Sequence, residues 1–142
     1  MNTHAREQGS ASLELAVLTP VVLLVLALVI AGARIVTAHA ALDTATAAAA
    51  RAATLTRTAP AAQTAAQRAA DHTLGQNGLR CAQRQTTVDT SGFATAPGQP
   101  GTVTVTASCT VPLADLALPG LPGRVPLSSS FASPLDPYRE RT

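Results

Sequence analysis

The stretch Gly9-Ser10-Ala11-Ser12-Leu13-Glu14 opens an apolar run that extends to Ala33 and organises the rest of the chain. Residues 15–33 carry no charge, and Thr19 is the one clearly polar side chain among them. At a rise of about 1.5 Å per residue, a helix over this run reaches roughly 28 Å, close to the thickness of a bilayer's hydrocarbon core. The run therefore predicts a single transmembrane helix.

Glu14 stands at the entrance of this apolar run. A carboxylate carried toward the bilayer centre costs on the order of 2.5–3.5 kcal/mol, so a plain anchor gains nothing from an acid at this place. We therefore expect a positively charged partner for Glu14. The alternative is a solvated Glu14 at the headgroup level, near a helix start, where a negative charge is favoured.

A glycine, four small or apolar residues, a glutamate and a long apolar helix resemble the processing site of type IV prepilins. The longer run from Gly9 to Pro20, with Leu127-Ser-Ser-Ser and Pro134-Leu-Asp-Pro-Tyr-Arg139 near the other end, is similar to TadE-like proteins of tight-adherence (Tad) pilus systems. The resemblance implies cleavage between Gly9 and Ser10 by a prepilin peptidase on the cytoplasmic side, and a role in building or priming a thin pilus.

Cleavage at that bond would free an amine on Ser10, four residues before Glu14. Residues at this spacing are neighbours on a helix, and their opposite charges attract far more strongly in a low dielectric than in water. The pair could close within one subunit or between two stacked subunits. Between subunits it would set the axial register, because a buried charge tolerates few wrong positions.

Composition limits the other functions. The 142 residues suffice for one small domain and a span, with only three aromatic residues, Phe93, Phe131 and Tyr138. All ten basic residues are scattered arginines, so we expect no nucleic-acid surface. The chain shows no Ser-His-Asp spacing, phosphate-binding glycine loop, close carboxylate pair or metal-ligand cluster. We therefore expect no enzyme, cofactor, metal or small-molecule substrate.

The two cysteines, Cys81 and Cys109, both follow the apolar run, with twenty-seven residues between them. That separation is too long for a CxxC redox or zinc motif. In an exported domain a disulfide is the natural interpretation, and it would help stabilise a small core. Two unrelated buried thiols remain the alternative.

Helical character is predicted beyond the span. From Ile35 to about Thr58 the chain is rich in alanine, without Gly or Pro, and a stripe of small or apolar residues could pack on the protein's own sheet or on neighbouring pilin-like helices. Pro60 interrupts the pattern, which resumes over 61–74. Within the span, Pro20 removes one helical N–H; it could be a harmless kink or a point of loosening as subunits leave the bilayer.

The C-terminal half predicts strands. Residues 79–89 suggest a short strand, and from Thr102 to Val111 apolar residues alternate with Thr and Ser, which puts Cys109 on the inward face. Residues 125–131 suggest a last strand. The expected fold is α+β: a transmembrane helix that continues into a long alanine-rich helix, then a small antiparallel, pilin-like sheet.

We accordingly expect a leader peptide over 1–9, a transmembrane helix over 10–36 and an extracytoplasmic domain over 37–142, helical over 37–75 and strand or loop over 79–142. The protein would span the cell membrane once, with its N-terminus cytoplasmic. Its partners would be the membrane, prepilin peptidase, other pilin-like subunits and the pilus assembly machinery. Arg6 before the span against Arg34 and Arg51 after it slightly favours the opposite orientation, but one charge is a weak bias.

Two other functions fit the same sequence. Ala38-His39-Ala40 matches a signal-peptidase site, which would release a small secreted binding module, although the apolar run exceeds the usual h-region of about 7–15 residues. An uncleaved, anchored envelope protein is the third possibility.

Overall fold

The computed structural model describes the backbone of residues 4–116 and 122–138, and the side chains of residues 14–115 and 122–138. The elements follow in the order α1 (His4–Thr54), α2 (Ala59–Gln76), β1 (Gln83–Asp89), η1 (Ser91–Ala94), β2 (Gly101–Pro112), η2 (Leu113–Leu116) and β3 (Arg124–Leu135). The expected α+β fold, a long N-terminal helix followed by a small antiparallel sheet, is confirmed.

The sheet is a three-stranded meander in the order β1-β2-β3, with both pairs antiparallel. The central strand β2 follows the predicted alternation: its buried side chains are those of Val103, Val105, Ala107, Cys109 and Val111. Its Thr and Ser side chains lie on the opposite, more exposed face. A period of two thus gives the sheet one face for the core and one for water.

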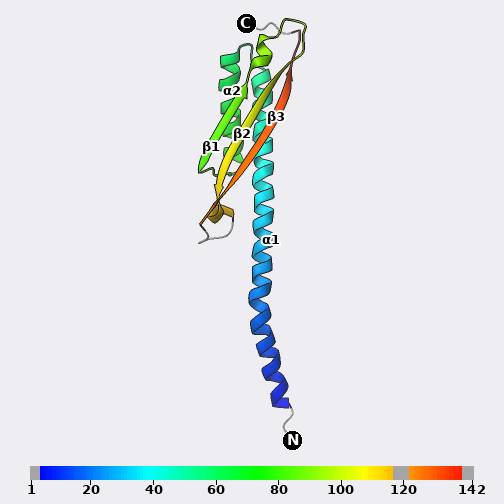
Figure 1. Cartoon of the computed structure of the whole chain (residues 1–142), viewed down its shortest axis with the longest axis vertical. Helices are drawn as coiled ribbons and strands as arrows, with labels where there is room; N and C mark the ends of the chain where they lie inside the picture. The colour runs from blue at the N-terminus through cyan, green and yellow to red at the C-terminus, as the bar shows by residue number, and fades with distance from the viewer. Residues whose placement is uncertain (1–3, 117–121, 139–142) are drawn as a thin grey trace.

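Both helices lie on the apolar face of this sheet (Figure 1). One core cluster surrounds Leu42 of α1 and Leu74 of α2; the other joins alanines of both helices, including Ala49, Ala53 and Ala66, to the valines of β2. Small side chains allow α1 and α2 to approach closely. The predicted stripe of small residues on α1 therefore packs on the protein's own sheet and second helix, which is the first of the two interpretations given above.

Local chemistry explains where α2 begins and ends. The Thr58 hydroxyl accepts a hydrogen bond from the Ala61 N–H, and Pro60 occupies the first turn, where a missing N–H costs nothing. At the other end Gly78 adopts φ 65°, and the Leu79 N–H bonds back to the Leu74 carbonyl. This is the usual glycine-terminated helix end.

Two strands differ in detail from the expectation. β1 begins at Gln83 rather than Leu79, because Leu79 and Cys81 turn into the core beside β2 before strand pairing starts. In β3, Leu127 and Leu135 are buried, whereas Phe131 is 38% exposed. Phe131 pairs with Val105 but lies on the edge strand, so the helices cover it incompletely.

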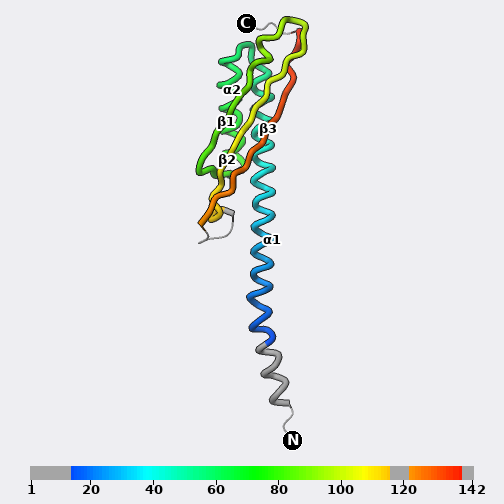
Figure 2. Tube along the Cα trace, in the orientation of Figure 1, coloured from blue at the N-terminus to red at the C-terminus, as the bar shows by residue number. Residues whose placement is uncertain are grey.

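The folded domain covers only the C-terminal half of α1. In Figure 2 the helix extends well beyond the sheet and α2, toward the N-terminus. The large apolar side chains of residues 15–30 are all exposed, and Ala31 is the first buried residue of α1 after Glu14. The molecule is thus a small folded domain at the C-terminal end of a long helix whose other end is apolar and exposed.

Candidate functional site: the motif and the apolar end of α1

The predicted processing residues lie near the start of α1. The backbone is helical from His4, so the Gly9–Ser10 bond falls within a helix. The side chains of Gly9 and Ser10 lie outside the described residues, and their role as a processing site stays a prediction. Glu14 is exposed and forms no ion pair with any side chain of residues 14–115 or 122–138. Its role in orienting the helix stays a prediction.

The segment after Glu14 has the properties of a membrane span. Within the described chain, one helix is long and apolar enough to cross a bilayer, and its described part, Glu14–Thr54, contains the apolar window. The side chains of this window are almost entirely unburied by the protein itself, with Leu15 69% and Val29 63% exposed. A core helix of a water-soluble protein would bury such residues, so this segment is a candidate membrane span.

The one polar side chain between Leu15 and Ala33 is satisfied locally. The Thr19 hydroxyl donates a hydrogen bond to the Leu15 carbonyl at 2.6 Å. α1 continues through Pro20 without a break. Whether Pro20 acts as a kink or a point of loosening during assembly stays a prediction.

Just beyond the span, α1 is tied to the edge strand of the sheet. His39 Nδ1 lies 3.4 Å from a carboxylate oxygen of Asp43, one turn later on α1. A hydrogen bond from Ser129 of β3 lowers the pKa of Asp43, and His39 acts in the same direction. The hydrogen bond between Asp43 of α1 and Ser129 of β3 is therefore strongest when Asp43 is charged.

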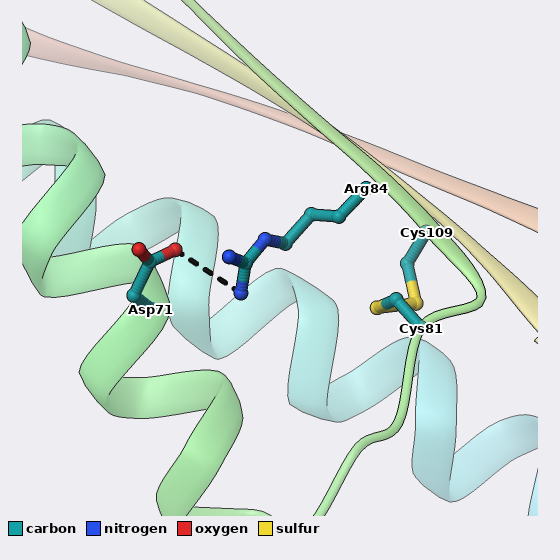
Figure 3. The surroundings of a disulfide bond; sticks show 4 residues. All are labelled: Asp71, Cys81, Arg84 and Cys109. Atoms are coloured by element: carbon teal, nitrogen blue, oxygen red, sulfur yellow. Dashed lines mark ion pairs between the residues drawn. A yellow bond between two sulfur atoms is a disulfide. The ribbon is translucent and has the colours of Figure 1, made fainter.

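The disulfide is confirmed: Cys81 and Cys109 are bonded, with their Cα atoms 5.3 Å apart (Figure 3). The bond fastens the chain entering β1 to the inward face of β2, and Cys109 is 1% exposed. Protein disulfides persist in oxidising compartments.

Figure 3 also shows an ion pair that sequence reasoning missed. Arg84 of β1 lies 3.1 Å from Asp71 of α2. Only the packing of α2 against β1 brings Arg84 to this acid. Both side chains are about half exposed, so the pair orients α2 more than it stabilises the domain.

No group of three His, Cys, Asp or Glu side chains that could hold a metal ion occurs among the residues whose side chains are described. His72 lies exposed on α2, and His39 contacts Asp43.

Comparison with known proteins agrees with the motif. The family of TadE-like proteins matches residues 9–51, from the predicted processing glycine to the last turn of α1. No curated protein and no solved structure matches the chain. The match covers the segment that holds the glycine–glutamate motif and the span and leaves the sheet outside it. Residues 9–51 thus identify the chain as similar to TadE-like proteins, a family associated with tight-adherence pili.

Proposed function

We propose that this chain is a pilin-like subunit of a Tad-type pilus or a related secretion system, inserted in the cell membrane through α1 and processed by a prepilin peptidase between Gly9 and Ser10. The observation that carries the proposal is the division of α1. The TadE-like match covers both parts of the helix. The large apolar side chains of residues 15–30 are exposed, whereas the C-terminal part of α1 forms part of the core of a small domain.

This division suits a subunit that first lies in a bilayer and then packs against other subunits. The apolar side chains of residues 15–30 point to all sides of the helix and are exposed. The same surface can face lipid tails or other helices, because both environments are apolar. Glu14 would orient the helix by pairing with the new amine of Ser10, in its own subunit or in a neighbour.

The disulfide supports an extracytoplasmic location for the domain, since such bonds are rare in the reducing cytosol. The N-terminus would then be cytoplasmic, on the side where a prepilin peptidase acts. Assembly would bring the domain together with other pilin-like subunits and the pilus machinery. The chemistry needed from the protein itself is insertion and packing.

Release by signal peptidase after Ala40 fits the structure less well. Ala38 and Ala41, on either side of that bond, are 7% and 8% exposed and belong to a continuous helix that packs on the domain. Because both residues are buried against the domain, the Ala40–Ala41 bond is shielded from a protease once the domain has folded.

The mass and N-terminal sequence of the protein purified from its native membrane test the proposal. A chain beginning at Ser10 is expected. A chain beginning at Met1 would indicate an uncleaved, membrane-anchored protein, and a chain beginning at Ala41 would indicate a secreted module. Gly9→Val should block the cleavage, whereas Ala11→Val, two residues along, should be cleaved normally.

The role of Glu14 needs a separate experiment. Glu14→Ala should insert, be cleaved and fold, yet fail to enter assembled pili, because the orienting charge is missing. Glu7→Ala, which removes an acid from the predicted leader, serves as the control and should assemble. Normal surface pili from Glu14→Ala would contradict the assigned role.

A further inference from the structure

A cavity of about 290 Å³ opens where the folded domain meets the end of the apolar run. Arg34 of α1 and Arg80, just before β1, both line it, together with Asp115 of η2. Its apolar lining includes Ala38, Leu79 and Val111. The cavity is therefore built from four separate parts of the chain and exists only in the folded domain.

The height of this cavity on α1 places it at the surface of the bilayer. Arg34 follows Glu14 by twenty residues, and a helix of that length rises about 30 Å, the thickness of the hydrocarbon core. If Glu14 lies at one interface, Arg34 lies at the other. The cavity then opens among the lipid headgroups on the domain side.

Its two arginines are available for an anion. Neither guanidinium forms an ion pair with an acid whose side chain the structure describes. The other polar side chains of the lining already donate elsewhere: the Thr37 hydroxyl to the Ala33 carbonyl, and the Asn77 amide to the Thr73 carbonyl. Arg34 and Arg80 are thus the main donors, and guanidinium groups bind phosphate oxygens with a matching pair of hydrogen bonds.

Charge balance narrows the class of anion. Two arginines and Asp115 give the cavity a formal charge of +1. The C-terminal end of α2, beside Asn77, adds a partial negative charge. A phosphodiester carries one negative charge and matches this lining, whereas free inorganic phosphate carries more. The apolar side chains beside the arginines suit the glycerol and first acyl carbons of a lipid.

We propose that this cavity binds the headgroup phosphate of one membrane phospholipid, held between Arg34 and Arg80. The inference rests on the proposed insertion of α1 in a bilayer. Arg34 comes from the span and Arg80 from the domain, so a shared phosphate joins the two to the membrane surface. The disulfide at Cys81 holds the residue next to Arg80 against β2 and so limits the movement of that donor. The bound lipid fixes the tilt of the domain over the bilayer.

The test uses the full chain in detergent, stripped of lipid and titrated with a phosphatidylglycerol or with inorganic phosphate, with bound molecules counted by native mass spectrometry. One phospholipid should bind per chain, and millimolar inorganic phosphate should not displace it. Arg80→Gln and Arg34→Gln should each weaken lipid binding at least about tenfold, the effect of losing one charge-assisted contact.

Arg51→Gln is the matched control, an exposed arginine on the same helix about 25 Å farther from the span. It should bind lipid as the unaltered chain does. Equal lipid binding by Arg80→Gln and Arg51→Gln would overturn the proposal, as would displacement by inorganic phosphate. Alkaline extraction of membranes carrying each variant reports insertion separately, so loss of the span is distinguished from loss of the lipid site.

Discussion

Removal of the Cys81–Cys109 bond gives the most quantitative test of the folded domain. The bond closes a loop between residues 28 apart in sequence. The chain-entropy relation assigns that loop about 12 cal/mol/K, or roughly 3.6 kcal/mol of unfolding free energy at 25 °C. Most buried side chains of the domain are alanines, which contribute little apolar area each. The loss is therefore a large share of the roughly 5–15 kcal/mol that stabilises an ordinary domain.

The double variant Cys81→Ala/Cys109→Ala should be compared with the unaltered chain by pulse proteolysis across a urea series, in detergent micelles. With an m value of about 2 kcal/mol/M, its unfolding midpoint should fall by nearly 2 M urea. Reductant should lower the midpoint of the unaltered chain similarly and leave the double variant unchanged. A decrease of the midpoint by less than about 0.5 M urea would refute the reasoning, because the core would then be stable without the disulfide.

Three further changes probe the packing and the link between α1 and β3. Leu74→Ala should cost about 2–5 kcal/mol of unfolding free energy because Leu74 is 2% exposed, while Leu55→Ala, at 71% exposure, should change it by less than about 0.5 kcal/mol in the same urea assay. Gly92→Ala should destabilise the domain measurably, since a Cβ there collides with the backbone of β2, whereas Gly75→Ala has open space and should be neutral or slightly stabilising. The pKa of Asp43 is lowered in the folded state, so its charged form stabilises the domain above the unfolded pKa of about 3.9, and this stability is lost as the pH falls through the lower folded pKa. Asp43→Asn should therefore lose less unfolding free energy than the unaltered chain between pH 5 and pH 2, as measured by urea midpoints.

Periodicity and charge were sufficient for the elements themselves. The uncharged run after Glu14 is long enough to span a bilayer, and strict alternation from Thr102 to Val111 leaves one face of a strand apolar. Both patterns depend only on the repeat of the backbone, 3.6 residues for a helix and 2 for a strand. The inward direction of Cys109 followed from the same alternation, and the pairing with Cys81 was confirmed.

The limits of those elements were less certain. β1 begins four residues later than expected because Leu79 and Cys81 are recruited into the core, and Phe131 stays partly exposed because β3 is an edge strand. Neither the start of β1 nor the exposure of Phe131 can be predicted from the local sequence. Each depends on which elements cover which part of the sheet.

From the sequence alone came the span, the glycine–glutamate motif and its likeness to TadE-like proteins, and a helix followed by an antiparallel sheet. Tertiary structure alone decided that Arg84 meets Asp71, that Asp43 reaches Ser129, and that Arg34 and Arg80 line one cavity. The physical reason is sequence separation. Contacts within a turn or a strand repeat follow from backbone geometry, whereas contacts between distant residues depend on how the helices cross the sheet and in which register the strands pair.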